Sequence, residues 1–128
     1  MTLREQLRVL VVDDMSTSRG LLTQALDAFG VRNVASVADG PSALKALEIS
    51  PVHLVISDYN MPKMDGLHLL HALRQNQRTK GVGFILITGR ADRAIIEKGK
   101  QLGMNNFLKK PFEPLQLKAC IEAVVGRL

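Results

Sequence analysis

The chain has 128 residues and is poor in the residue types that hold very small or extracellular folds together: it has one cysteine, no tryptophan and 4% aromatic residues. A single cysteine, Cys120, cannot form a disulfide within the chain, so a disulfide-held scaffold is excluded. No apolar run approaches the roughly 18 residues that a membrane helix needs. The first apolar run leads directly into Asp13 and Asp14, unlike a secretory signal peptide. We therefore expect a cytoplasmic protein that does not insert into a membrane.

The charge balance is basic, with 17 Lys and Arg against 12 Asp and Glu, a net charge of +5. A basic balance is one property of nucleic-acid-binding proteins. Here the charges are spread along the chain, and no helix-turn-helix, zinc-finger or aromatic RNA-binding signature is present. We expect no nucleic-acid partner. The length suits one compact domain, and no repeat or linker divides it, so residues 1–128 are expected to form a single domain.

Short apolar runs alternate five times with segments whose apolar residues fall at helical spacing. This alternation predicts an α/β fold, a doubly wound five-stranded parallel sheet with five helices on its two faces. The run over 33–37 is weak and is expected at an edge, which gives the strand order 2-1-3-4-5. Ser16 or Thr17 is expected to cap the first helix, and Gly30 to end it in a left-handed conformation. The expected strands cover 9–12, 33–37, 54–58, 84–87 and 106–109, and the expected helices start near 17, 41, 67, 91 and 113.

Polar residues follow four of these strands at the point where each one ends. Asp13 and Asp14 follow the first strand, Asp58 ends the third, Thr88 follows the fourth and Lys110 follows the fifth. Parallel strands bring their carboxyl ends to one edge of the sheet, where open α/β sheets bind ligands. Any one of these residues has an ordinary structural explanation, but together they predict a site. We interpret Asp58 as a nucleophile that accepts a phosphoryl group.

Three carboxylates close together repel one another, and a hard divalent cation removes that cost. Mg²⁺ prefers oxygen ligands and keeps part of its water shell, so it suits Asp13, Asp14 and Asp58. The backbone carbonyl of Asn60 is a further candidate ligand. Lys110 would then pair with one phosphoryl oxygen. The hydroxyl of Thr88 would hydrogen-bond another.

These residues carry a resemblance to a known family. The segments Val11-Val12-Asp13-Asp14, 58–66 (DYNMPKMDG), Ile87-Thr88-Gly89 and Lys110-Pro111-Phe112 occur in this order along the chain. Together they resemble the receiver domain of bacterial two-component response regulators, and most of all the stand-alone chemotaxis regulators of the CheY type. The resemblance covers essentially the whole chain and implies the flavodoxin-like version of the fold predicted above.

By this resemblance, Asp58 accepts phosphate from a chemotaxis-type histidine kinase, and Mg²⁺ is required. Asp13 would ligate the metal directly and Asp14 through a water molecule. Thr88 and Phe107 match the pair that couples phosphorylation to the output face, and the Lys110–Pro111 bond is expected to be cis. Such a protein is a phosphoacceptor in a phosphorelay rather than an enzyme acting on a separate substrate.

The resemblance also implies an output surface, made by the helix over 91–102, the strand over 106–109 and the helix over 113–127. We expect this surface to be basic and to control flagellar rotation by binding the motor switch protein. The alternative is a phosphate sink, which drains a shared kinase and binds no motor. Motor-binding members usually carry Tyr at the position of Phe107, which favours the sink. Asn60 and Arg90 are expected to tune the phosphoryl lifetime. A phosphatase would be a further partner, and the protein is expected to be a monomer.

Two other classes of function remain open from the sequence. An aspartate-dependent phosphohydrolase would use the same carboxylates, but no additional general acid and no room for a cap domain are evident. A DNA-binding transcription factor would need an output domain, and the chain ends at Leu128 directly after its last expected helix. His68 and His71 are interpreted as a surface pair, because no third metal ligand is evident. Met61 and Met64 are interpreted as loop packing and Cys120 as an apolar filler.

Overall fold

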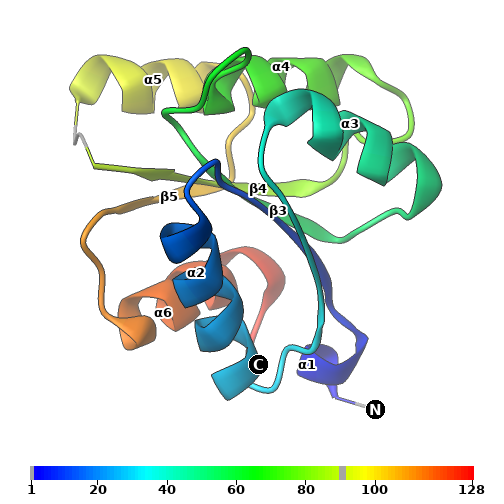
Figure 1. Cartoon of the computed structure of the whole chain (residues 1–128), viewed down its shortest axis with the longest axis vertical. Helices are drawn as coiled ribbons and strands as arrows, with labels where there is room; N and C mark the ends of the chain where they lie inside the picture. The colour runs from blue at the N-terminus through cyan, green and yellow to red at the C-terminus, as the bar shows by residue number, and fades with distance from the viewer. Residues whose placement is uncertain (1, 90–91) are drawn as a thin grey trace.

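Buried apolar runs form the centre of the computed structural model, which describes residues 2–89 and 92–128. The runs pair side by side as a five-stranded parallel sheet in the order β2-β1-β3-β4-β5 (Figure 1). The predicted strand order is therefore confirmed. The strands are β1 (Arg8–Val12), β2 (Asn33–Val37), β3 (Leu54–Asp58), β4 (Gly83–Thr88) and β5 (Asn106–Lys109). The helices are α1 (Leu3–Gln6), α2 (Ser16–Ala28), α3 (Gly40–Ile49), α4 (Gly66–Gln75), α5 (Arg93–Gln101) and α6 (Pro114–Val125).

Two groups of buried residues cover the two faces of the sheet. Successive residues of a strand point to opposite faces, and Val9 and Val11 of β1 accordingly join one group while Leu10 and Val12 join the other. The first group packs against α2 and α6, and the second packs against α3, α4 and α5. Figure 1 shows these two helix layers on either side of the sheet. All five residues of β3 are buried because this strand lies at the centre.

The edge strands differ from the central ones as the sequence predicted. None of the five residues of β2 is fully buried, in agreement with its weak apolar pattern. β5, the other edge, is short, and its first three residues are half-buried. No helix of the described residues is both long and apolar enough to cross a membrane.

Two local features differ from the expectations. The chain begins with one additional helical turn, α1, in which the Glu5 side chain accepts hydrogen bonds from the backbone N–H and the hydroxyl of Thr2. The prediction that Ser16 or Thr17 caps the following helix is wrong. Ser16 is already the first residue of α2, and Met15 occupies the cap position. Gly30 does end α2 with a positive φ of 85°, as predicted.

Candidate functional site

Asp13 is buried at the carboxyl end of β1, where its two carboxylate oxygens have different roles. Oδ1 accepts a hydrogen bond of 3.0 Å from the backbone N–H of Met15. This bond fixes the backbone that leads into α2, whose N-cap residue Met15 provides no side-chain cap. The guanidinium of Arg19 also donates to the Asp13 carbonyl oxygen at 2.8 Å. Sequence reasoning missed Arg19, which fastens the loop that carries the acidic pair to α2.

Asp58 ends the central strand β3 and is 7% exposed. The loop after it returns tightly to the sheet: the N–H of Tyr59 donates to the carbonyl of Ile87, and the N–H of Gly66 donates to the carbonyl of Tyr59, both at 2.8 Å. A Cβ atom at Gly66 would lie 2.6 Å from the carbonyl oxygen of Asp58. Only glycine allows α4 to start this close to the phosphoacceptor candidate. The sequence indicated a turn here but not this close approach.

Lys110 follows the edge strand β5 and reaches back across the end of β4. Its backbone N–H donates to the carbonyl of Thr88 at 2.8 Å, which fixes where the side chain starts. Its ammonium nitrogen lies 3.3 Å from Asp58 Oδ1 and 3.6 Å from Asp13 Oδ2, and it donates to the hydroxyl of Ser18 at 3.1 Å. Thr88 itself is buried at the end of β4. The structure therefore brings together the residues that the sequence placed at four strand ends.

The pKa of Asp58 is raised above its usual value, mainly because burial removes water from the charged form. The neighbouring Asp13 carboxylate raises this pKa further, whereas the Lys110 ammonium opposes the rise. The site thus holds more negative charge than one lysine compensates. This excess of negative charge in a partly desolvated site favours the binding of a cation.

The residues fit a hard divalent cation. Oxygen atoms of Asp13, Asp14 and Asp58 lie within 4.8 Å of one another, and no other group of His, Cys, Asp or Glu in the described residues converges in this way. Asp13 Oδ2 is buried and has no hydrogen-bond partner within the described part of the chain. The Lys110 ammonium at 3.6 Å offsets part of the cost of burying this ionised oxygen, and a metal ion in contact with it would offset more. Asp14 is exposed, and Asn60, two residues after Asp58 in sequence, is exposed on the loop after β3.

Three further site predictions have different outcomes. Phe107 lies on β5 and is half-buried, packed against the group of core residues beneath α3, α4 and α5. The Lys110–Pro111 bond is cis, as expected. Arg90, predicted to tune the phosphoryl lifetime, lies outside the described residues.

The residues interpreted as structural agree with that interpretation. His68 and His71 are exposed on α4, and His68 Nδ1 pairs with Asp65 Oδ1 at 2.8 Å rather than with the second histidine. Met61 is buried in the core and Met64 packs against it. Burial raises the pKa of Cys120 to about 11, which makes the thiol a poor nucleophile at neutral pH.

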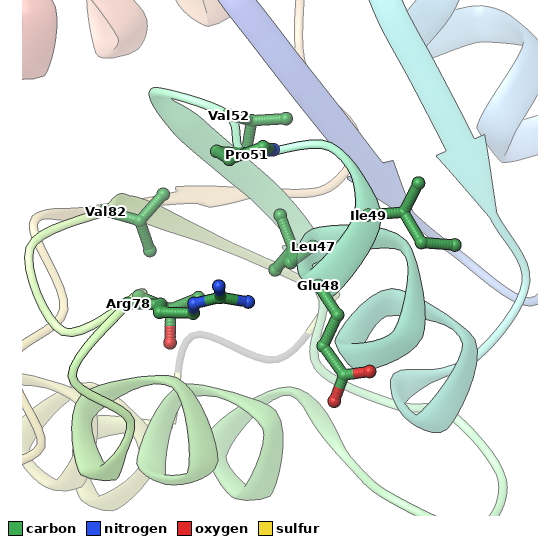
Figure 2. A pocket seen from close by; sticks show the side chains of 8 residues that line it. Leu47, Glu48, Ile49, Pro51, Val52, Arg78 and Val82 are labelled. Atoms are coloured by element: carbon green, nitrogen blue, oxygen red, sulfur yellow. The ribbon is translucent and has the colours of Figure 1, made fainter.

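Two hollows lie at opposite ends of the strands, and only one of them adjoins the carboxyl ends where the candidate site lies. One, of about 420 Å³, lies at the opposite edge, between the end of α3 and the loops that precede β3 and β4 (Figure 2). Its lining includes one acid, Glu48, and one base, Arg78, and lacks a cluster of carboxylates. The other, of about 610 Å³, adjoins the candidate site and is mostly apolar. Its lining comprises Met15, Thr17, Ser18, Leu21, Ala25, Lys110, Pro111, Phe112 and Pro114.

Comparison with known proteins agrees with this geometry. The sequence profile of the response regulator receiver domain matches residues 9–122. A probable chemotaxis protein CheY of Rhizobium etli is 48% identical over 128 residues, covering 100% of this chain and 99% of the relative. The solved structure of CheY4 of Vibrio cholerae superimposes with a TM-score of 0.87 at 30% identity, covering 92% of this chain and 98% of that one.

A further solved structure is informative about the acidic edge. The receiver domain of a sensor histidine kinase from Pseudomonas aeruginosa was solved with a magnesium ion coordinated in its active-site cleft. It is similar to this chain with a TM-score of 0.84 at 28% identity, and the match covers 94% of this chain and 98% of that one. The profile match and the full-length relative together show the family: this chain belongs to the response regulator receiver domains of two-component systems and is of the CheY type.

Proposed function

We propose that the chain is a chemotaxis response regulator in which Asp58 accepts a phosphoryl group from a histidine kinase. One observation carries the proposal: a buried carboxylate meets two further carboxylates and a lysine ammonium at the carboxyl edge of the sheet. The Asp58 oxygen would form a bond to phosphorus while the bond from phosphorus to the donor's imidazole nitrogen breaks, and the departing nitrogen would take a proton from water. The phosphoryl group stays on the protein that accepts it, so each protein molecule would accept one phosphoryl group and would not act as a catalyst on a separate substrate.

Mg²⁺ is the cofactor that we assign to the acidic edge, with Asp13, Asp58 and the Asn60 carbonyl as ligands and Asp14 acting through water. Bound Mg²⁺ would neutralise phosphoryl oxygens and orient the group for transfer. The protein contributes the other cation, because the Lys110 ammonium already lies 3.3 Å from the accepting oxygen. The hydroxyl of Thr88, on the neighbouring strand end, would hydrogen-bond another phosphoryl oxygen.

Intact-mass spectrometry tests the assignment directly. Wild type and Asp58→Asn are incubated with acetyl phosphate and Mg²⁺, and with acetyl phosphate and EDTA. We expect one phosphoryl adduct on the wild type with Mg²⁺, and none on the variant. An adduct on Asp58→Asn at wild-type yield would show that another residue accepts phosphate. Sustained hydrolysis of generic phosphomonoesters, instead of stoichiometric labelling, would support the phosphohydrolase alternative.

Lys110→Ala separates the role of the lysine from that of the metal ligands. We expect this variant to bind Mg²⁺ at least as well as wild type, because a positive charge 3.6 Å from Asp13 is removed. Its phosphorylation and the response to it should be strongly weakened. Calorimetry measures the first property and mass spectrometry the second. Weakened Mg²⁺ binding with intact phosphorylation would reverse the assigned role.

The output surface in this proposal consists of α5, β5 and α6. Four of its predicted basic residues, Arg93, Lys98, Lys100 and Lys109, are exposed, while Lys118 is half-buried. Exposed positive charge favours an acidic partner and makes association sensitive to salt. Lys98 also lines a hollow with His68 and His71 between α4 and α5, so part of this charge faces α4. Phe107, on β5, is part of this surface, lies on the strand that pairs with β4, and would transmit the change.

Motor control is the output that we propose, with the phosphate sink as the second candidate. Full-length similarity to a probable CheY chemotaxis protein supports a chemotaxis role. The missing hydroxyl at Phe107 favours the sink, since a contact available to tyrosine is absent. Binding of the beryllofluoride-activated protein to motor-switch peptides decides between them. Unchanged affinity on activation, together with rapid uptake of phosphate from the kinase, would establish the sink. We propose a cytoplasmic location and a single domain over 1–128 for either output.

A further inference from the structure

Ser18, on the first turn of α2, contacts Lys110 from the face of the sheet that α2 and α6 cover. The Ser18 hydroxyl oxygen lies 3.1 Å from the ammonium nitrogen. This separation is shorter than those from the ammonium to Asp58, 3.3 Å, and to Asp13, 3.6 Å. Within the described residues, the closest side-chain oxygen to the Lys110 ammonium therefore belongs to a neutral hydroxyl.

The number of oxygens around Lys110 matches the number of hydrogens on its ammonium. An ammonium has three N–H donors and no acceptor, and the oxygens of Ser18, Asp58 and Asp13 surround it. Ser18 accepts a hydrogen bond from one of these donors, whereas Asp13 Oδ2, 3.6 Å from the ammonium nitrogen, interacts with it by charge alone and has no hydrogen-bond partner in the described residues. A phosphoryl group on Asp58 would place new oxygens beside the donor that now faces Asp58.

A lysine side chain is expensive to hold in one orientation, because fixing its rotatable bonds removes conformational entropy. Lys110 is 27% exposed, so burial alone does not immobilise it. Ser18 stands on a helix that is already anchored at this point, since the neighbouring Arg19 donates to the Asp13 carbonyl. The mostly apolar hollow beside Ser18 and Lys110 provides few other polar groups for the ammonium. The contact with Ser18 thus orients the cation before a phosphoryl group arrives, as preorganised sites require.

We propose that Ser18 is a positioning residue that holds Lys110 in the orientation needed to meet the Asp58 phosphoryl group. This inference rests on the roles proposed above for Asp58 and Lys110. Ser18 itself would touch neither the phosphoryl group nor the metal. Its loss should therefore affect properties that depend on Lys110 and leave Mg²⁺ affinity unchanged.

Three substitutions and one probe test the role of Ser18. Ser18→Ala removes the hydroxyl, Ser18→Thr keeps it, and Ser16→Ala removes an exposed hydroxyl from the same turn as a matched control. We expect Ser18→Ala to weaken affinity for beryllofluoride, measured with Mg²⁺ by calorimetry, and to slow phosphorylation by acetyl phosphate, each about fivefold. Ser18→Thr should restore both properties, and Ser16→Ala should behave like wild type. Wild-type behaviour of Ser18→Ala, or an equal loss in Ser16→Ala, overturns the proposal.

A double substitution shows whether Ser18 acts through Lys110. In a Lys110→Ala background, Ser18→Ala should cause no further loss of beryllofluoride affinity, because the group that it orients is gone. A loss of the same size in both backgrounds contradicts the inference. So does a parallel loss of Mg²⁺ affinity in the single variant, which would indicate a general disturbance of the site.

A chemical readout separates this inference from the proposed function. The acylation rate of Lys110 by an N-hydroxysuccinimide ester, followed by peptide mass spectrometry without any phosphodonor, reports on the ammonium alone. Loss of its hydrogen-bond acceptor should raise that rate about threefold in Ser18→Ala. An unchanged rate overturns the contact on which the inference depends. Failure of wild type to accept phosphate overturns the proposed function, whatever the acylation rate shows.

Discussion

Replacing Asp58 by Asn should make the metal-free protein more stable, although it removes the proposed phosphoacceptor. Coulomb's law at an effective dielectric constant of about 20 gives a repulsion of about 3.5 kcal/mol for two carboxylates at the 4.8 Å limit found here. The Lys110 ammonium, 3.3 Å from Asp58 Oδ1, attracts this carboxylate by about 5 kcal/mol in the same approximation. Because Asp14 is exposed, solvent screens its share of the repulsion. These two pair energies leave about 1.5 kcal/mol of net attraction, and we expect the desolvation cost of the buried Asp58 carboxylate, the largest cause of its raised pKa, to exceed it.

We therefore expect Asp58→Asn to raise the free energy of unfolding in EDTA by about 1 to 2 kcal/mol. Urea unfolding followed by far-ultraviolet circular dichroism measures it, since the chain has no tryptophan. Millimolar Mg²⁺ should narrow or reverse the difference, because wild type binds the cation more tightly and gains more stability from it. Asp27→Asn is a control: this exposed carboxylate pairs with Arg32 at 3.8 Å, and its loss should change stability by less than about 0.5 kcal/mol.

The dependence on pH follows from the raised pKa of Asp58. A carboxyl group with a higher pKa in the folded state than in the unfolded state binds its proton more tightly when folded. Its cost to stability is absent below the unfolded pKa and is fully present above the folded pKa. The advantage of Asp58→Asn should thus be largest at neutral pH and shrink on acidification. If Asp58→Asn were instead the less stable protein in EDTA at neutral pH, the charge argument would be wrong.

Two further predictions concern packing. Gly66→Ala should lower the free energy of unfolding by about 2 kcal/mol or more, because its Cβ would lie 2.6 Å from the Asp58 carbonyl oxygen. The matched Gly81→Ala, with no atom within 4 Å of the added Cβ, should lose less than about 1 kcal/mol in the same urea titration; equal losses would contradict the close-approach argument. Cys120, with its pKa raised to about 11 by burial, should react with iodoacetamide at pH 8 at least about tenfold more slowly in the native than in the urea-unfolded chain. Comparable rates would show that the thiol is accessible.

The sheet was predictable because its strands are strongly patterned and parallel strands leave few alternative orders. The same topology predicted that Asp13, Asp58, Thr88 and Lys110 meet. All strands of a parallel sheet run in one direction, so their carboxyl ends lie on the same side of the sheet. The functional roles of these residues stay predictions. The role of Arg90 in tuning the phosphoryl lifetime also stays a prediction, because that residue lies outside the described part of the chain.

Contacts that depend on the direction of individual side chains were not predictable. Ser18 and Lys110 are separated by 92 positions, and nothing local to either residue indicates the other. Ser16 and Thr17 are both good capping residues, and one or the other is predicted to cap α2, but the helix already includes them, and its N-cap residue Met15 makes no side-chain cap hydrogen bond. The turn α1 was overlooked as too short for a periodic signal, although the Thr2 and Glu5 spacing matches a capping box.

The position of Lys110 has a consequence during synthesis. The acidic groups of the site belong to the first half of the chain, whereas their cationic partner follows β5, the last strand to be made. A nascent chain that has already formed β1 and β3 would carry the carboxylates without the ammonium that compensates them. Efficient phosphate acceptance would begin only after β5 has joined the sheet beside β4 and brought Lys110 across to Asp58. Under the proposed function, a partly synthesised or truncated chain that lacks Lys110 would therefore withdraw phosphate from a kinase only weakly.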